Sequence, residues 1–306
     1  MQETLGGQGN KLRVDVLGSF FSTIRYAYAN NPGLDAAHAL CQEKLSTQQQ
    51  RQRARAKALE AADSHLQTFT ETLANGGRIR KRHFSNIKKQ LANSFHWDSE
   101  ARDSLVLFLR NRGWTVVQCA TEADVAIAAD AVQGDIVISG DSDLFIYKHV
   151  TVVWRPVRDG GFLEYRKSDV LSALGFKSAE QLTALGVVST NDYNHSIYGL
   201  GCETNYKILK DIDTSGSDEA KDVPTLVKEY LADERVVLKN KSKVTFNTSI
   251  SVFVDLKQTP ITPSHHDDAA SLKTRLGDIK RRFKEACGKL TEQKRAQLAS
   301  KLAAKR

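Results

Sequence analysis

Short runs of β-branched and apolar residues recur in the first half of the chain, with helix-prone stretches between them. The runs are LRVDVL (12–17), WTVVQC (114–119), DIVIS (135–139) and TVVWRP (151–156). Parallel strands need long crossover connections, so strands that alternate with helices form a mostly parallel sheet covered by helices. The sequence therefore predicts an α/β fold.

Helical segments are expected around and after these strands. SEARDSLVLFLRNRG (99–113) begins at a capping serine and ends at a glycine, and residues 34–73 are polar, rich in Ala, Gln and Arg, and lack a strand pattern. Residues 242–256 fit both spacings, with helix favoured, and 270–303 read as a basic helix or a partly disordered tail. Short helices are expected at 167–174, 178–188, 203–213 and 224–232.

This pattern predicts three parts of the chain. Residues 11–165 form an α/β core with a basic helical insertion at about 34–95. Residues 166–258 form a helical subdomain, and 259–306 a linker followed by a basic tail.

The sequence and its composition indicate the cellular location to be expected. The 306 residues contain no apolar run of the roughly 18 residues that cross a bilayer, and the N-terminus lacks the pattern of a secretion signal. Cys41, Cys119, Cys202 and Cys287 have neither zinc-site nor disulfide-framework spacing. We expect a monomer in the nucleus or cytoplasm that is neither secreted nor bound to a membrane. RIRKR (78–82) and KRRFK (280–284) could act as nuclear import signals, although such short runs are more often solvated.

Positive charge is concentrated in two regions of a chain with net charge +8. From Lys273 onward there are twelve Lys and Arg against three Asp and Glu, and residues 51–89 hold ten against three. A polyanion such as nucleic acid suits these regions, and solvated helical faces are the alternative.

Acidic residues stand where predicted strands end or helices begin. Asp15 lies inside the first strand, where a buried charge needs compensation. Glu122 and Asp124 follow the second strand, although Thr121 and Asp124 also fit a helix capping box. Asp141 and Asp143 follow DIVIS, where they also fit an ordinary turn, and STNDYNHSIYGLG (189–201) adds Asp192.

Carboxylates that converge at one edge of a sheet repel each other unless cations neutralise them. The carboxyl ends of parallel strands form the crevice where α/β proteins bind ligands. Oxygen ligands of this kind favour Mg²⁺ or Mn²⁺. The acids therefore predict a divalent metal site.

In order and spacing these motifs resemble the flap endonuclease/XPG family of nucleases, whose fold is PIN-like. The resemblance rests on VDVLGSFF, ATEADVAIA, ISGDSDLF and NDYNHSIYGLG, and it spans roughly residues 12–235. It implies a PIN-like core followed by a helix-two-turn-helix subdomain. It also implies a two-metal phosphodiesterase that acts in DNA repair on branched or flapped DNA, with RNA as the alternative substrate.

The resemblance assigns site residues one by one. The residues that match the family's metal-organising acids, and that would act in catalysis, are Asp15, Glu122, Asp124, Asp141, Asp143 and Asp192. Those that match its DNA-binding positions are Arg51, Arg53, Arg55, Lys57, Ser196, Ile197, Gly199, Gly201 and Lys207, with K⁺ expected near Ser196 and Ile197.

The sequence departs from the family in several places. A strand that ends in Asp-Gly is expected before the basic helix, but the chain runs CQEKLSTQQQRQRARAKAL there. GCETN follows the hairpin where basic residues are usual, and no sliding-clamp motif is found in the tail. The main prediction is a Mg²⁺-dependent endonuclease or 5′ exonuclease. The alternatives are a catalytically weakened member that binds nucleic acid or acts as a scaffold, and a basic binding domain without metal.

Overall fold

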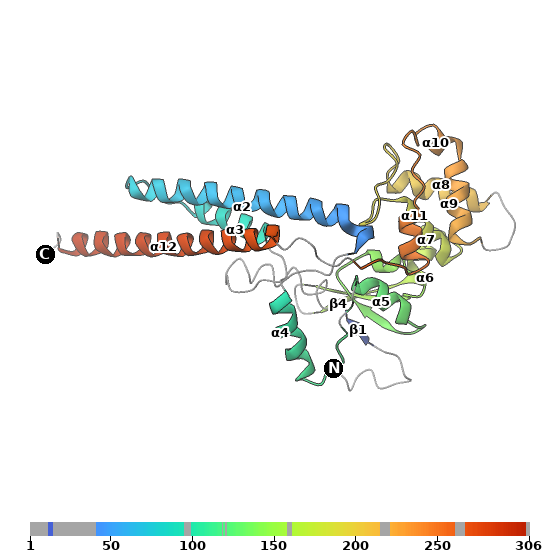
Figure 1. Ribbon diagram of the computed structural model, residues 1–306, viewed down its shortest axis with the longest axis horizontal. Helices are drawn as coiled ribbons and strands as arrows, with labels where there is room; N and C mark the ends of the chain where they lie inside the picture. The colour runs from blue at the N-terminus through green and yellow to red at the C-terminus, as the bar shows by residue number, and fades with distance from the viewer. Residues whose placement is uncertain are drawn as a thin grey trace. The chain divides into compact units, whose positions relative to one another are not determined.

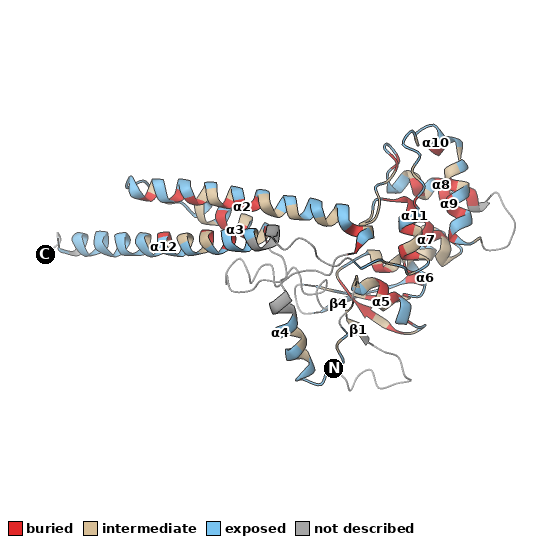
Figure 2. Cartoon of the chain, in the orientation of Figure 1, coloured by how far each residue is buried: buried red, intermediate tan, exposed pale blue. Residues whose placement is uncertain are grey.

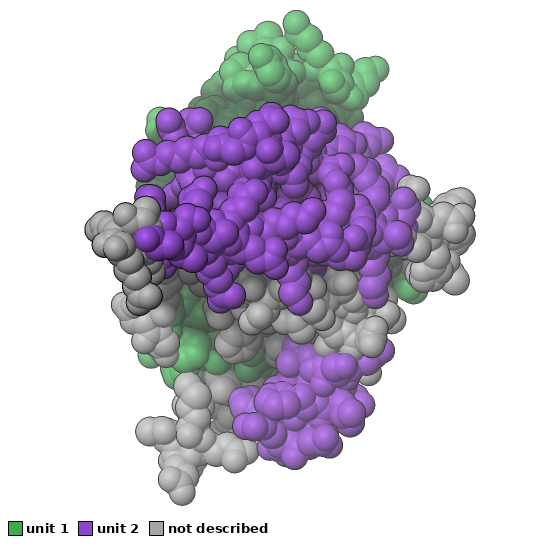
Figure 3. Space-filling model, turned by 90° about the vertical axis from the view of Figure 1, so that its left-hand side faces the viewer, with its two compact units in different colours: residues 1–21, 39–47, 117–261 green, residues 22–38, 48–116, 262–306 purple. Residues whose placement is uncertain are grey.

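The computed structural model describes residues 12–14, 41–94, 99–117, 119, 121–157, 161–214, 221–260 and 267–303. The chain divides into two compact units, which Figure 3 colours green and purple. Unit 1 comprises residues 1–21, 39–47 and 117–261, and unit 2 comprises residues 22–38, 48–116 and 262–306. The proposed limits of 11–165, 166–258 and 259–306 stay predictions.

A four-stranded sheet lies in unit 1. Its order is β1 (Leu12–Val14), β2 (Ile136–Ile138), β3 (Val152–Pro156) and β4 (Phe162–Arg166). β1 and β2 are parallel, β2 and β3 are parallel, and β3 and β4 are antiparallel. The predicted α/β class, with a mostly parallel sheet flanked by helices, is confirmed. The sequence did not predict β4. Val157, just after β3, donates its backbone N–H to the carbonyl oxygen of Gly161, just before β4, at 3.0 Å.

The predicted strand at 114–119 is wrong, because residues 114–117 and 119 form no strand. Trp114 N donates to Leu109 O at 3.2 Å, and Arg110 Nη2 donates to Val116 O at 3.1 Å. The segment thus folds back on the end of α4 (Ser99–Arg110). Trp114 is 51% exposed and Val117 is 75% exposed, so the apolar run has no buried face to support pairing.

Helices make up the rest of unit 1 (Figure 1). They are α5 (Ala123–Asp130), α6 (Lys167–Leu174), α7 (Ala179–Val188), α8 (Cys202–Thr214), α9 (Val223–Ala232), α10 (Glu234–Val237) and α11 (Asn247–Phe253). The four short helices predicted after residue 166 are confirmed, and so is the helix favoured within 242–256. Local signals explain them: Ser178 and Gln181 form a capping box at α7, and Gly175 ends α6 at φ 64°.

The buried core of unit 1 joins α5, the sheet and helices α7–α11 (Figure 2). Tyr147 and Phe253 pack with their ring centroids 5.0 Å apart. Gly186 of α7 lies against Ile146, and a Cβ at Gly186 would stand 2.5 Å from Ile146 Cγ1. This close approach fixes α7 against the segment that carries Asp143.

Unit 2 contains α2 (Leu45–Ala74) from residue 48 onward. It also contains α3 (Lys81–Asn93), α4 and α12 (Asp267–Ala303). α2, α3 and α12 lie side by side (Figure 1), and Phe69, Phe84 and Phe283 form one aromatic cluster between them. The long helix predicted at 34–73 is confirmed from residue 45, and its first part, 34–40, lies outside the described residues. Residues 270–303 are helical, as one of the two readings predicted. No described helix combines the length and the apolar composition that crossing a bilayer requires.

Candidate active site

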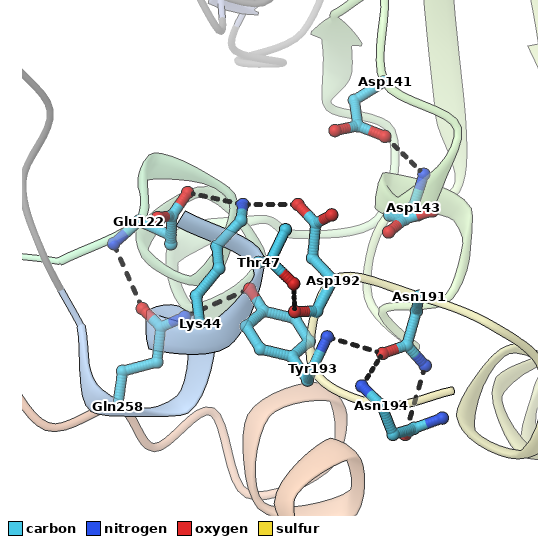
Figure 4. Close-up of polar contacts among 10 residues, drawn as sticks. All are labelled: Lys44, Thr47, Glu122, Asp141, Asp143, Asn191, Asp192, Tyr193, Asn194 and Gln258. Carbon is cyan, nitrogen blue, oxygen red and sulfur yellow. Dashed lines mark hydrogen bonds and ion pairs between the residues drawn. The ribbon is translucent and has the colours of Figure 1, made fainter. Parts of the chain in front are cut away.

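Two of the predicted acids share one cation, and that cation is a lysine. Lys44 Nζ lies 3.1 Å from Glu122 Oε2 and 2.7 Å from Asp192 Oδ2 (Figure 4). All three residues belong to unit 1. The Lys44 side chain is only 8% exposed, while those of Glu122 and Asp192 are 21% and 23% exposed. The structure therefore brings Glu122 and Asp192 together, 70 positions apart in the sequence.

Electrostatics keep this lysine charged. Burial alone lowers the pKa of Lys44, but the attraction of Glu122 and Asp192 outweighs it, so the net shift of the pKa is upward. The ammonium also lies 5.9 Å from the centroid of the Tyr193 ring. Burial raises the pKa of the Tyr193 phenol, which stays neutral and able to donate a hydrogen bond.

The backbone around Lys44 is fixed by several contacts within unit 1. Lys44 ends the 3₁₀ helix η2 (Gln42–Lys44), which leads into α2. Gln42 N donates to Thr259 O at 3.0 Å, and Thr259 N donates to both carboxylate oxygens of Glu43 at 2.9 and 3.0 Å. Thr47 Oγ1 donates to Asp192 O at 2.7 Å. The lysine and one of its acids are thus held by the same segment.

Neighbouring side chains position the acids. Glu122 N donates to Gln258 Oε1 at 3.1 Å, and Gln258 Nε2 donates to Tyr193 OH at 3.1 Å (Figure 4). Glu122 is the N-cap residue of α5 and makes no side-chain capping bond there, so the cap position expected for Thr121 is taken by Glu122. Gln258 links the segments of Glu122 and Tyr193.

The loop that carries Asp192 is organised by two asparagines. Asn191 Oδ1 accepts hydrogen bonds from Tyr193 N at 2.9 Å and from Asn194 N at 3.0 Å. Asn191 Nδ2 donates to Gly186 O at 2.9 Å, and Ser249 Oγ donates to Asn194 Oδ1. These bonds fasten the loop to α7 and α11 and so set the direction of Asp192.

Asp141 and Asp143 follow β2 as predicted, and they form a local turn. Asp141 N donates to Ser139 Oγ at 3.0 Å. Asp143 N donates to Asp141 Oδ1 at 3.0 Å, as Figure 4 shows. Asp141 is exposed and Asp143 is half-buried. The turn-forming reading of this pair is therefore confirmed, and it leaves a metal role untested.

Two predicted acids remain, Asp124 and Asp15. Asp124 lies in the first turn of α5 and is half-buried. Burial raises the pKa of Tyr147, and the negative charges of Asp124 and Asp143 act in the same direction. Asp15 lies outside the described residues.

The acidic side chains around Lys44 carry oxygen atoms of the type that binds divalent metal ions. Carboxylate oxygens are the ligands of Mg²⁺ and Mn²⁺, and Lys44 shows that Glu122 and Asp192 hold a positive charge. Among the residues that the structure describes, no three His, Cys, Asp or Glu side chains form a group that could hold a metal ion. The donor set fits a divalent cation only if its members gather more closely than they do around Lys44.

The hairpin between α7 and α8 contains most of the predicted DNA-binding residues of unit 1. Ile197 is buried, and Ser196 N donates to Thr190 Oγ1 at 3.2 Å. Gly199 has φ 79°, which suits glycine, and its carbonyl oxygen accepts a hydrogen bond from Lys239 Nζ at 2.8 Å. An ammonium thus contacts a carbonyl of the turn near which K⁺ was predicted.

The other predicted DNA contacts lie just before α8, on α8 and on α2. Gly201 precedes α8, and Lys207 on α8 pairs with Glu203 at 3.0 Å. On the unit 2 part of α2, Arg51, Arg53 and Lys57 are exposed and Arg55 is half-buried. Burial, and then the charge of Arg51, lowers the pKa of Arg55. A site that gathers positive charge in this way suits a polyanion.

Comparison with known proteins gives fold-level similarity. No family model matches the chain, and no curated protein matches it. Among solved structures, flap endonuclease-1 from Methanococcus jannaschii is 16% identical with a TM-score of 0.40, over 71% of this chain and 66% of that one, just under two thirds of its length.

Two further solved structures are of the same kind. The catalytic core of Rad2 in complex with DNA substrate is 16% identical with a TM-score of 0.35, over 73% of this chain and 74% of that one. A mutant of the T5 5′-exonuclease is 17% identical with a TM-score of 0.27, over 71% and 92%. All three similarities are at an identity of 17% or less and a TM-score of 0.40 or less.

Several residues of the site were missed at the sequence level. Lys44 stands in QEKLST, with nothing beside it to indicate an acidic partner. Gln258 and Tyr193 carry no motif. Asn191 had a usable signal, because an asparagine two positions before a tyrosine in a Ser-Thr-Asn-Asp run is typical of a side-chain-stabilised turn.

Proposed function

We propose that this protein is a nuclease that hydrolyses phosphodiester bonds in DNA with Mg²⁺ or Mn²⁺. The observation that carries the proposal is the cation held jointly by Glu122 and Asp192. Two half-buried carboxylates from distant parts of the chain meet only at a cost, since like charges repel. A place built to hold positive charge is what a metal-dependent nuclease requires.

The residues divide the work by their chemistry. The divalent ions would be held by Asp15, Glu122, Asp124, Asp141, Asp143 and Asp192, and bound metal supplies an activated water and stabilises the leaving oxygen. Asn191 and Gln258 orient the acids through their hydrogen bonds. The basic face of α2 attracts phosphates, and the backbone of the Gly199–Gly201 turn offers N–H groups to them.

The finer parts of the proposal follow from the motif resemblance. Branched or flapped DNA is the proposed substrate, with K⁺ at the 196–201 hairpin, a monomeric enzyme and a nuclear location with a role in DNA repair. The exposed Tyr198, at 96% exposure, and the lysines near the hairpin support a contact with nucleic acid there.

A second candidate is a nucleic-acid-binding protein with weakened catalysis. The observation in its favour is that Lys44 fills the cation position between Glu122 and Asp192.

Cleavage of end-labelled flap, duplex and single-stranded DNA, in Mg²⁺ and in EDTA, separates the two candidates. Asp141→Asn keeps the side-chain oxygen that accepts from Asp143 N while it removes the charge, so we expect folding to be kept and cutting to be lost. Asp255→Asn, on an exposed acid elsewhere in unit 1, is the matched control. Cutting by Asp141→Asn at the wild-type rate contradicts the metal assignment, and binding without any metal-dependent cutting selects the second candidate.

A further inference from the structure

The connection between α10 and α11 brings three lysines to the 196–201 hairpin. We propose that this connection, residues 238–246, binds the phosphate backbone of nucleic acid and supplies the positive charge that the hairpin itself lacks. We call it the lysine loop. The inference rests on the proposed function, because it takes nucleic acid as the substrate, and it adds binding residues that no motif indicates.

A hydrogen bond joins the lysine loop to the hairpin. Lys239 Nζ donates to Gly199 O at 2.8 Å, and a Cβ added at Gly199 would lie 3.4 Å from the same ammonium. The two residues belong to unit 1 and stand 40 positions apart in the sequence. The lysine loop therefore lies next to the turn whose backbone N–H groups could meet a phosphate.

The hairpin and the first residues of α8 carry no positive charge of their own. Residues 196–206 contain Glu203 and no Lys or Arg, and Lys207, which follows them, pairs with Glu203 at 3.0 Å. The lysine loop contains Lys239, Lys241 and Lys243 and no acidic residue. A phosphate that approaches the hairpin would thus find its counter-charges on the lysine loop.

Hydrogen bonds and packing hold the backbone of the lysine loop in one shape. The Asn240 side chain accepts from Val244 N at 2.8 Å and donates to Val244 O at 3.0 Å. Phe246 is 3% exposed, and its ring centroid lies 6.2 Å from that of Tyr230. Because the backbone is already ordered, binding a phosphate costs less conformational entropy than it would on a mobile connection.

Lys243 has a backbone conformation that is unfavourable for a lysine. Its φ is 51°, in the left-handed region that glycine adopts without steric cost. Strain of this kind collects at functional sites. Glycine would suit the turn better but would remove the ammonium, so the lysine at this position indicates a role for its charge.

The two lysines beyond Lys239 face solvent. Lys241 and Lys243 are exposed, and neither forms an ion pair with a residue that the structure describes, whereas Lys148 of the same unit pairs with Glu180 at 2.6 Å. Tyr198 of the hairpin is 96% exposed. An aromatic ring beside lysines suits nucleic acid, since the ring can stack on a base while the ammonium groups contact phosphates.

DNA binding by the full chain in EDTA, where no metal-dependent cutting takes place, tests the lysine loop. The anisotropy of a fluorescently labelled flapped duplex is measured across salt concentrations. We expect Lys241→Gln combined with Lys243→Gln to raise the dissociation constant. The slope of the logarithm of the binding constant against that of salt should become shallower by about 2, because two phosphate contacts are lost.

A matched control removes the same charge elsewhere in unit 1. Lys148→Gln combined with Lys228→Gln, on two exposed lysines, should keep the wild-type slope. An equal slope in the wild type and the lysine-loop variant, an equal loss in the control, or no DNA binding by the wild type overturns the proposal. Loss of binding to phosphatidylserine vesicles with unchanged DNA binding assigns the lysine loop to an anionic membrane and also overturns it.

Lys243→Gly separates a binding role from a structural one. Glycine adopts φ 51° without strain, so the melting temperature should stay the same or rise, while the salt slope becomes shallower by about 1. A lower melting temperature with the wild-type slope would assign Lys243 to folding and overturn the proposal.

Failure of the nuclease is a separate result. If the wild type binds DNA with the expected dependence on Lys241 and Lys243 but never cuts it in Mg²⁺, the nuclease is rejected and the lysine loop is kept. If the wild type cuts DNA and the lysine-loop variant binds as the wild type does, only the lysine loop is rejected.

Discussion

The acidic cluster of unit 1 and the basic helix face of unit 2 treat charge in opposite ways. In unit 1 Lys44, Glu122 and Asp192 are mostly withdrawn from water and compensate one another. In unit 2 Arg51, Arg53 and Lys57 point into solvent. A charge enclosed by protein must find its counter-charge within the chain, while an exposed charge can exchange water and salt for a phosphate. The first kind defines a site, and the second defines a surface.

Removing one lysine from each region tests this contrast most strongly. Lys44→Met leaves two half-buried carboxylates without their cation, so we expect the free energy of unfolding to fall by about 2–4 kcal/mol, somewhat less than for a fully buried pair. Lys57→Met should change it by roughly 0.5 kcal/mol or less. Urea unfolding in EDTA measures both. An equal change in the free energy of unfolding in the two variants would contradict this difference between the two regions.

Glycine substitutions extend the contrast to packing. Gly186→Ala places a Cβ 2.5 Å from Ile146 Cγ1, so we expect a loss of about 1–3 kcal/mol of stability from overpacking. Gly277→Ala on α12 meets nothing within 4 Å and should stabilise the helix by roughly 0.5–1 kcal/mol. Thermal unfolding of both variants gives the signs, and a stabilising Gly186→Ala would show that α7 has room to shift.

A second buried lysine sharpens the role of the carboxylates. Lys167 is buried, and its Nζ donates to Tyr147 O at 2.6 Å and to Lys148 O at 3.3 Å. Burial lowers the pKa of Lys167 to about 8, even though Glu180 acts in the opposite direction. Lys44 and Lys167 are both enclosed. Direct contacts with carboxylates raise the pKa of Lys44, whereas burial lowers the pKa of Lys167.

The lowered pKa predicts a pH dependence with a definite sign. From about pH 8 to 10.5 the folded protein releases a proton from Lys167 that the unfolded chain keeps, so the free energy of unfolding rises with pH. We expect a gain of about 1 kcal/mol between pH 8 and 9. Comparing that rise in the wild type with Lys167→Met isolates it. The same rise in both proteins would assign the effect to other groups.

The smallest effect on folding is expected on the basic face of α2. Arg51, Arg53 and Arg55 replaced together by Gln should change stability little, while DNA binding weakens and the slope of its logarithm against salt falls by about 2–3. Binding measured across salt concentrations checks this, with Lys148→Gln as a control. An unchanged slope would show that this face is only solvated.

Local signals account for most of what the sequence predicted. α7 and α9 begin at Ser178 and Asp222, whose side chains accept from the backbone three residues on, and such caps are visible in the sequence. Strand pairing is not local. WTVVQC has the composition of a strand, yet its backbone bonds go to the end of α4 and the sheet forms without it.

The acidic site also combines local contacts, which the sequence predicted, with long-range contacts, which it did not. The turn of Asp141 and Asp143 after β2 was predictable, because its hydrogen bonds span two residues. The pairing of Lys44 with Glu122 and Asp192 joins positions 78 and 148 residues apart. No window of sequence contains both partners, so only the folded chain shows that the site holds a cation of its own.

The enclosure of Lys44 also has a chemical consequence. Amine-labelling reagents attack only the neutral form of a lysine, and they must reach it from solvent. A side chain that is 8% exposed, with its pKa shifted upward, should therefore be among the slowest lysines of the chain to be acylated. The labelling rate of this one amine then reports, in an intact and unmutated protein, how often the ammonium leaves its two carboxylates.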